Sequence, residues 1–188
     1  MRVYVVRHGE SENNKSLRWT GWMDVLLTEK GEEDARRAGT MLADIAFDKV
    51  YASDLRRAMR TAEIALPGCS YETTPLLREV NVGNLENTPI SDLSEDQRAE
   101  NGRMGYGMFG GESKSEFRDR ISRFMKLLEA SGQETVAVFC HGGWLRGMLD
   151  LVIGMDLPRN KICCNNCTVA VFEFTKGIWR LHSWINLS

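Results

Sequence analysis

Residues 2–10 read RVYVVRHGE and residues 135–143 read TVAVFCHGG. Each stretch begins with β-branched, aromatic and other apolar residues, and each ends in a histidine followed by glycine. Runs of this kind predict buried strands, here over Arg2–Val6 and Thr135–Cys140. Strands that are apolar on both sides are typical of a parallel sheet covered by helices on both faces, which places a histidine just beyond each strand.

The sequence around these two strands predicts helices in alternation with further strands. Thr28, Ser53 and Ser113 are the expected N-caps of three helices, and Glu116 completes a capping box with Ser113. The expected helices are Thr28–Ala46, Ser53–Leu66, Ser113–Ala130 and Gly142–Ile153, with strands over Lys49–Ala52, Thr168–Phe174 and Ile178–Ile185. We therefore predict an α/β fold, a three-layer α/β/α arrangement with a mainly parallel central sheet and a C-terminal hairpin.

Composition indicates one domain and excludes some kinds of partner. The chain has 188 residues, 43% of them hydrophobic, so we expect a single domain over 1–188, with residues 87–111 as a short cap insertion. A net charge of −2 favours neither nucleic acid nor a membrane surface, and no apolar run approaches the ~20 residues of a membrane span. We interpret the N-terminal segment as a strand rather than a signal peptide, and the five cysteines as free thiols in a reducing cytoplasm.

Basic groups follow three of the predicted strands, as Arg7-His8, Arg56-Arg57 and His141. The carboxyl ends of parallel strands share one edge of a sheet, where ligands bind. Helices expected to begin at Ser53 and Gly142 would add N–H donors and positive dipole ends there. Burying this much positive charge without a partner would be costly, so the sequence predicts a site for a doubly charged anion, and phosphate is the obvious one.

The ordered motifs resemble those of the histidine phosphatase superfamily (phosphoglycerate mutase-like, branch 1). Residues 7–11 with Asn14 and Thr20-Gly21-Trp22 resemble the N-terminal signature of that family. Residues 53–58 resemble its second motif, 77–83 the segment that carries a general acid, and 140–143 the segment of a second histidine. The resemblance spans almost the whole chain.

The resemblance implies a phosphohistidine mechanism and a set of site residues. His8 is the implied nucleophile, Glu79 the general acid and base, and Glu86 a nearby alternative to Glu79. The implied catalytic residues are Arg7, His8, Arg57, Glu79 and His141, and the implied phosphate-binding residues are Arg7, Asn14, Thr20, Gly21, Arg57, His141 and Gly142. No metal is expected, and no cofactor, except a 2,3-bisphosphoglycerate primer if the protein is a mutase.

The acceptor of the phosphoryl group stays open at this stage. We favour water, and so a phosphomonoester hydrolase acting on a small phosphorylated metabolite, because the cap is short and water exclusion decides the fate of a phosphoenzyme. Thr20–Asp24 favours a mutase instead, although only Lys15, Arg18, Arg78 and Arg103 could grip a second anion. A non-catalytic phosphate-binding module is a remote alternative, since binding alone needs only the arginines.

Other patterns are weaker. Residues 105–110 spell a dinucleotide-binding glycine motif, but they follow no strand and open no helix, so we interpret them as cap. Cys163, Cys164 and Cys167 have no second ligand pair at zinc-binding spacing. An apolar rim of Trp22, Met104, Tyr106, Met108 and Phe109 could admit a bulky alcohol or simply pack the cap. The oligomeric state is open.

Overall fold

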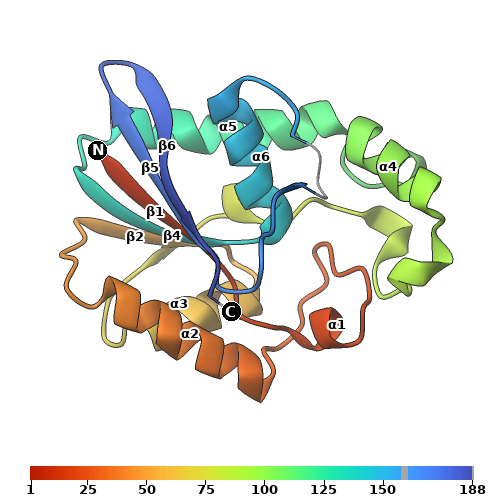
Figure 1. Cartoon of the computed structure of the whole chain (residues 1–188), viewed down its shortest axis with the longest axis horizontal. Coiled ribbons are helices and arrows are strands. Elements are labelled where there is room, and N and C mark those ends of the chain that lie inside the picture. The colour runs from red at the N-terminus through yellow and green to blue at the C-terminus, as the bar shows by residue number, and fades with distance from the viewer. Residues whose placement is uncertain (158–160, 188) are drawn as a thin grey trace.

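A six-stranded sheet in the order β3-β2-β4-β1-β5-β6 forms the centre of the molecule (Figure 1). The computed structural model describes residues 1–157 and 161–187. The neighbours β3, β2, β4 and β1 are parallel, whereas β5 and β6 are antiparallel to their neighbours and form the C-terminal hairpin. The strands are β1 (Arg2–Arg7), β2 (Lys49–Ala52), β3 (Glu72–Thr73), β4 (Thr135–Cys140), β5 (Val169–Thr175) and β6 (Ile178–Ile185). The predicted α/β fold is confirmed, and the two-residue β3 is an addition to it.

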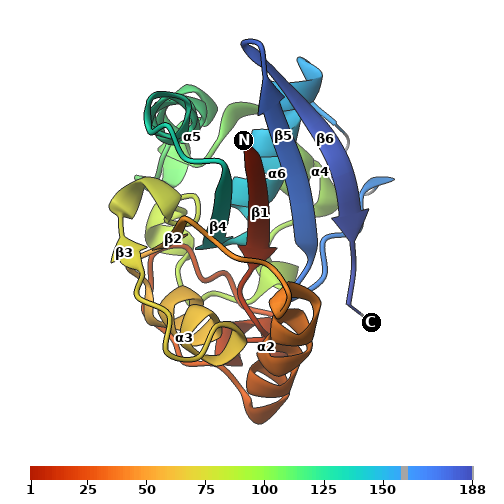
Figure 2. The same ribbon diagram turned by 90° about the vertical axis from the view of Figure 1, so that its left-hand side faces the viewer.

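Helices cover both faces of the sheet. Successive strand residues point to opposite sides, so an apolar strand such as β4 buries side chains on both faces. Val136 and Val138 of β4 join the core under α5 (Lys114–Ala130) and α6 (Gly142–Ile153). Ala137 and Phe139 join the core over α2 (Glu29–Leu42) and α3 (Arg56–Ala65). Figure 1 shows these helix pairs on opposite sides of the sheet, and in Figure 2 the strands follow one another from β3 to β6.

Two of the three expected N-caps are present. The Thr28 hydroxyl accepts the Gly31 N–H at 3.0 Å, and Ser113 forms the predicted capping box with Glu116. α2 ends at Leu42 rather than at Ala46, because Ile45 and Phe47 leave the helix direction to pack on the core beneath it. No helix in the described ranges combines the length and apolar character that crossing a membrane requires.

The prediction that Ser53 caps a helix is wrong. The Ser53 N–H still continues the sheet by donating to the Phe139 carbonyl at 2.9 Å, and α3 begins only at Arg56. A carboxylate from another loop caps this helix: Asp24 Oδ1 accepts the Arg56 N–H at 2.8 Å. A cap supplied from so far along the chain has no local signature, which is why the sequence pattern missed it.

Residues 87–111, the predicted cap insertion, contain a helix that the sequence did not indicate. α4 (Glu95–Met104) begins with a capping box between Ser94 and Gln97, but its few apolar residues form no continuous face. The short 3-10 turns Ile90–Asp92 and Gly107–Phe109 flank it. Val82, Leu85 and Leu93 make a small core that fixes this region to the body.

Two glycines lock the loop after β1 to the first turn of α2. A Cβ on Gly31 would lie 2.0 Å from the Glu10 carbonyl oxygen, and one on Gly9 would lie 2.2 Å from the Gly31 carbonyl oxygen. Thr28 N–H also donates to the Glu10 carbonyl at 2.9 Å. The backbones of these two segments are therefore in direct contact next to His8, the residue that follows β1. Only glycine allows so close an approach.

We expect Gly31→Ala to lower the free energy of unfolding by about 1–3 kcal/mol, since the added methyl group meets backbone that has no room to move. The matched control is Gly102→Ala on α4, where an added Cβ meets nothing within 4 Å. That change should raise stability by about 0.4–1 kcal/mol. Urea unfolding measures both, and equal effects from the two substitutions would contradict the close contact.

Candidate active site

The register of β1 and β4 brings the two motif histidines together. Arg7 pairs with Cys140 across the parallel strands, so His8 and His141 leave neighbouring strands at the same level. The His8 N–H continues the ladder by donating to the Cys140 carbonyl at 2.9 Å. The two imidazole rings lie edge to face with centroids 5.1 Å apart.

The His8 ring has a defined orientation and tautomer. It is buried, and its Nδ1 lies 2.7 Å from the Gly9 carbonyl oxygen. Because a carbonyl can only accept, Nδ1 carries the proton and Nε2 keeps its lone pair. The His8 carbonyl accepts from the Cys167 N–H and from the Asn166 amide, each at 3.2 Å. The loop before β5 therefore fixes the backbone of the proposed nucleophile.

His141 is oriented by Ser53, the residue that was predicted to cap a helix but does not. Its Nε2 lies 2.9 Å from the Ser53 hydroxyl, and the residue has no exposed surface. The other ring nitrogen, Nδ1, is buried without a hydrogen-bond partner among the described residues.

Arg7 and Arg57 flank the two histidines and are held by carbonyl groups. Arg57 is almost completely buried and donates to the Met23 and Gly21 carbonyls, each at 2.9 Å. Arg7 donates to the Cys164 carbonyl. In each guanidinium the Nε–H is buried without a partner in the described part of the chain.

The electrostatic state of this cluster follows from burial and like charge. Burial lowers the pKa of His8 well below its ordinary value of 6.5, and the Arg57 and Arg7 charges lower it further. Burial likewise lowers the pKa of His141, with Arg57 and His8 acting in the same direction. Burial lowers the pKa of Arg57 to about 10, opposed by Glu79 and Asp24, so its charge persists at neutral pH. Both imidazoles are neutral beside two cations, and such a cluster can bind a multiply charged anion.

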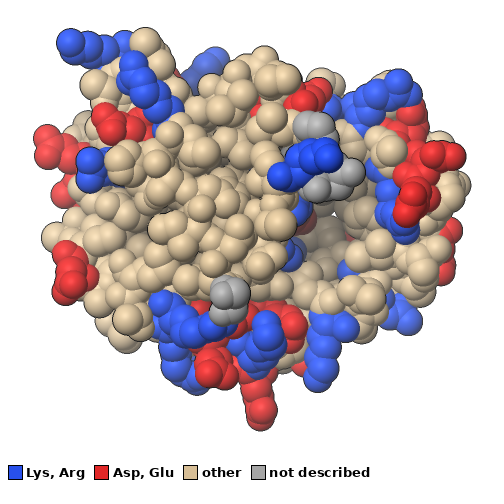
Figure 3. All heavy atoms as spheres, viewed as in Figure 1, with Lys and Arg blue, Asp and Glu red and all other residues tan. Residues whose placement is uncertain are grey.

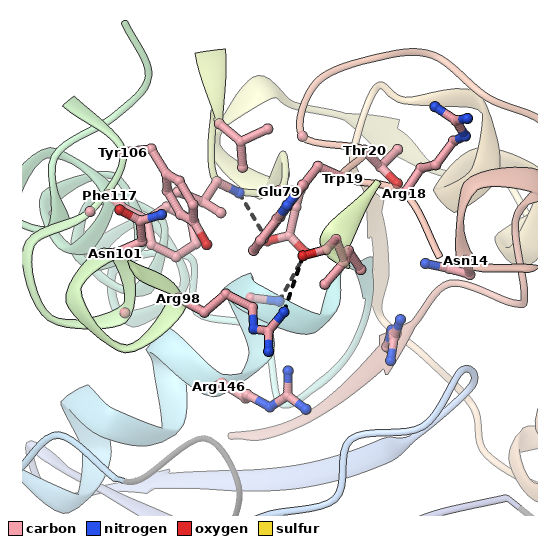
Figure 4. Close-up of a pocket in the computed structure, with 18 of the residues that line it drawn as sticks. Asn14, Arg18, Trp19, Thr20, Glu79, Arg98, Asn101, Tyr106, Phe117 and Arg146 are labelled. Carbon is pink, nitrogen blue, oxygen red and sulfur yellow. Dashed lines mark hydrogen bonds between the residues drawn. The ribbon is translucent and has the colours of Figure 1, made fainter. Parts of the chain in front are cut away.

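Glu79 lines the same cavity as His8, Arg7 and Arg57. Figure 4 shows its side chain among the other labelled residues of that cavity. Its Oε1 accepts the Val80 N–H and its Oε2 accepts the Gly143 N–H, each at 2.9 Å. Arg120 Nη2 and Trp22 Nε1 donate to its backbone carbonyl at 2.9 and 2.7 Å.

Glu86, the alternative acid, has a different position. Its Oε1 accepts the N–H groups of Trp22 and Met23 at 2.6 and 3.1 Å, which holds the loop that Arg57 also binds. Among the described residues that line the cavity, Glu86 is not present. The geometry therefore favours Glu79 as the acid.

Asn14, Thr20 and Gly21 also line the cavity. Asn14 lies in the short helix α1 (Glu12–Lys15), and its Oδ1 accepts from the Ser11 N–H at 3.2 Å and from Asn166 at 3.0 Å. With the oxygen occupied, the Asn14 amide nitrogen remains as the donor toward the cavity. Asn166, which organises both Asn14 and His8, was missed because no local pattern links it to them.

Glycines at the start of α6 allow close approach. A Cβ on Gly143 would lie 2.2 Å from Glu79 Oε1, and one on Gly142 would lie 3.1 Å from Arg7 Nε. The Gly143 N–H donates to Glu79, and the role of the Gly142 N–H as a phosphate donor stays a prediction.

The cavity has a volume of about 430 Å³ and is strongly cationic. Figure 3 shows a hollow beside the cap with Lys and Arg side chains at its edge. Of the four predicted anchors for a second anion, Arg18 lines the cavity, Arg78 pairs with Asp54 at 2.6 Å, Arg103 pairs with Glu100, and Lys15 is exposed elsewhere. The lining cations that the sequence did not indicate are Arg98, Lys114 and Arg146.

The predicted apolar rim is mostly absent. Only Tyr106 of the five residues lines the cavity. Met104 and Met108 are 62% and 78% exposed, Phe109 packs on the cap core, and Trp22 lies 4.8 Å from the Arg78 guanidinium as a support for the Glu79 loop. Their packing and solvent positions fit the alternative that these residues mainly join cap to body.

The cysteines form no ligand cluster. Within residues 1–157 and 161–187, no group of three or more His, Cys, Asp or Glu side chains is arranged to hold a metal ion. Cys164 and Cys167 are buried, and burial raises the pKa of Cys167 to about 12. Burial raises the pKa of Cys164 as well, so both thiols are neutral core residues.

Comparisons with known proteins agree with this geometry. A family model described as histidine phosphatase superfamily (branch 1) matches residues 3–187. A probable phosphoglycerate mutase GpmB of Erwinia tasmaniensis is 33% identical, over 98% of this chain and 90% of its own length. The protein TTHB049 from Thermus thermophilus superposes with a TM-score of 0.80 at 32% identity over the full length of both chains. A putative alpha-ribazole-5'-P phosphatase from Escherichia coli gives a TM-score of 0.83 at 25% identity, covering 99% of this chain and 97% of that one.

The lowered pKa values of His8 and His141 predict an acid-sensitive fold. Each histidine is neutral in the folded chain but takes up a proton on unfolding below pH 6.5, so the stabilisation is complete above 6.5 and is lost as the pH falls. The free energy of unfolding should drop by about 1.4 kcal/mol per pH unit for each histidine. Urea titrations between about pH 5 and 6 measure this slope.

His141→Asn should reduce the dependence of the unfolding free energy on pH by the contribution of one histidine, about 1.4 kcal/mol per pH unit. The double variant with His8→Asn should reduce it by the contribution of both. His182→Asn, at an exposed position on β6, is the matched control and should leave the slope as it is. A slope that is the same in all variants would mean that the two histidines are protonated in the folded state.

Proposed function

The chain belongs to the histidine phosphatase superfamily (branch 1), and from that premise we propose that it hydrolyses phosphomonoesters through a phosphohistidine formed on His8. The observation that carries this proposal is the Nδ1 contact of His8 with the Gly9 carbonyl at 2.7 Å. It leaves the Nε2 lone pair as nucleophile. Around it, Arg7 Nε, Arg57 Nε and His141 Nδ1 are buried without a hydrogen-bond partner among the described residues.

In the first step, His8 Nε2 attacks phosphorus and forms an N–P bond while the P–O bond to the organic alcohol breaks. The protonated Glu79 carboxyl gives its proton to the departing oxygen, and the alcohol leaves. In the second step, water attacks phosphorus, the N–P bond breaks, and Glu79 accepts the proton of that water. Inorganic phosphate is released, and His8 returns to its free form.

Arg7, Arg57 and His141 stabilise the charge that spreads over the equatorial phosphoryl oxygens. Hydrogen bonds to charged groups contribute about 1.5–3 kcal/mol each, and these donors are in place before the substrate arrives. The arginines supply positive charge where other phosphotransfer enzymes use a metal ion, so the proposed reaction needs none.

A mutase that passes the phosphoryl group to a second substrate hydroxyl is the second candidate. The phosphoglycerate mutase name of the Erwinia tasmaniensis relative supports it, whereas the Escherichia coli neighbour is described as a putative phosphatase. We favour hydrolysis because the cap is short and the cavity opens to solvent beside it (Figure 3), which gives water a route to the phosphohistidine.

We expect that a labelled phosphomonoester will transfer its phosphoryl group to the protein in an acid-labile, base-stable form. His8→Ala should abolish both the label and turnover, because the nucleophile is gone, whereas His182→Ala should retain both. Rapid-quench labelling with alkaline and acid gels measures this, and label that persists in His8→Ala would disprove the assignment.

Hydrolysis and mutase activity differ in their acceptor. With water as the acceptor, the purified protein should release phosphate steadily from phosphomonoesters without any bisphosphorylated primer. A coupled phosphate assay, run beside an assay for interconversion of 2- and 3-phosphoglycerate, measures both reactions. Primer-dependent isomerisation with negligible phosphate release would establish the mutase and leave the His8 chemistry unchanged.

A further inference from the structure

The loop that carries Glu79 has no helix or strand to hold it. It spans residues 78–82, between the 3-10 turns Pro75–Leu77 and Gly83–Leu85. The hydrogen bonds that the Glu79 carboxylate accepts orient its side chain, but the reach of that side chain depends on where the backbone lies. Whatever fixes the backbone of this loop therefore determines where the proposed acid stands in the cavity.

The guanidinium of Arg120, in the middle of α5, binds the backbone on one side of Glu79. Its Nη1 donates to the carbonyls of Leu76 and Arg78 at 3.1 and 2.7 Å, and its Nη2 donates to the Glu79 carbonyl at 2.9 Å. Its Nε and Nη2 also donate to the two carboxylate oxygens of Glu112, each at 2.8 Å. Every N–H group of this guanidinium therefore has an acceptor.

Glu112 binds the backbone on the other side of Glu79. Its Oε2 accepts the Asn81 N–H at 2.8 Å, and its own N–H donates to the Asn81 carbonyl at 2.9 Å. The side chains of Arg120 and Glu112 are only 7% and 14% exposed, so water competes little for their hydrogen bonds. One buried ion pair thus holds the chain before Glu79 and two residues after it.

The ion pair has no direct access to the substrate. Arg120 and Glu112 are absent from the described residues that line the cavity of His8, and with Asn81 they line a separate pocket instead. Any effect of the pair on the reaction must therefore pass through the Glu79 loop. The planar fork of an arginine suits this task, because it spans several carbonyls and a carboxylate at once, which the compact ammonium of a lysine cannot do.

We propose that Arg120 and Glu112 are positioning residues for proton transfer by Glu79. They hold the backbone of the acid at the place from which its carboxyl group meets the oxygen of the leaving alcohol. This inference rests on the proposed function, which assigns that proton to Glu79. A misplacement of about 1 Å caused by a change far from the reacting atoms can cost about 100-fold in rate, so the loss of this support should be visible in the kinetics.

Two substrates that differ in their need for an acid test this on the full chain. The phenolate of phenyl phosphate is a poor leaving group without a proton, whereas the nitro groups of 2,4-dinitrophenyl phosphate stabilise the departing phenolate. The measured quantity is the ratio of kcat/KM for the two substrates. Within one protein this ratio does not depend on the folded fraction, so a loss of stability alone leaves it unchanged.

Arg120→Lys keeps the charge but removes the fork. It should lower kcat/KM for phenyl phosphate by about 100-fold, and for 2,4-dinitrophenyl phosphate by less than about fivefold. Glu112→Gln, which keeps an acceptor oxygen but loses the charge, should shift the ratio in the same direction by a smaller factor. Arg123→Met changes an exposed arginine of the same helix that makes no hydrogen bond or ion pair with the loop among the described residues, and this matched control should keep the wild-type ratio.

Glu79→Gln sets the scale, because it removes the acid itself. Added to Glu79→Gln, Arg120→Lys should lower kcat/KM for phenyl phosphate by less than about threefold more, since the support has nothing left to position. A wild-type ratio in Arg120→Lys, or its full loss repeated in the double variant, overturns the inference while the Glu79→Gln effect stands. A wild-type ratio in Glu79→Gln is the different result that defeats the assignment of the acid in the proposed function, and the inference with it.

Discussion

Guanidinium groups buried against backbone carbonyls hold the functional end of this protein together. Arg57 binds the carbonyls of Gly21 and Met23, and Arg7 binds that of Cys164. Carbonyl dipoles stabilise a buried cation without cancelling its charge, so the net positive charge remains available to a ligand. Arg120 shows the contrast: it holds the Glu79 loop through the carbonyls of residues 76, 78 and 79, but it is also neutralised by Glu112 at 2.8 Å. The arginine that only supports the site has a carboxylate partner, and the two that face the ligand bind carbonyls instead.

The sequence predicted those parts of the fold whose information is local. The apolar runs of β1 and β4, the capping box at Ser113 and the hairpin of β5 and β6 are each encoded within a few neighbouring residues, and each is present. Errors arose where distant contacts decide the outcome. Ser53 was expected to cap a helix because the residue type is right, but its hydroxyl bonds to His141 and Asp24 provides the cap. α4 was missed because a helix with few apolar residues gives no periodic signal.

The same distinction between local patterns and contacts from distant residues applies to the candidate site. Residues that directly follow strands, such as His8 and His141, could be placed together from topology alone. Residues that organise them from other loops could not. Asn166 bonds to both His8 and Asn14, and the Gly143 N–H bonds to Glu79, yet neither contact has a spacing rule that a single sequence reveals. The cations of the cap side were missed for the same reason, since Arg98 and Lys114 come from helices with different roles in the fold.

The parallel register of β1 and β4 also determines when the site can form. Most of the chain separates the two strands, so pairing them closes a long loop whose entropy cost is met only after β4 exists. Folds dominated by such non-local pairs fold slowly. During synthesis, the first half of the polypeptide carries His8, Arg57 and Glu79 but lacks the strand that aligns them. In a nascent chain, His8 and His141 can therefore come together only after β4 and the start of α6 have left the ribosome.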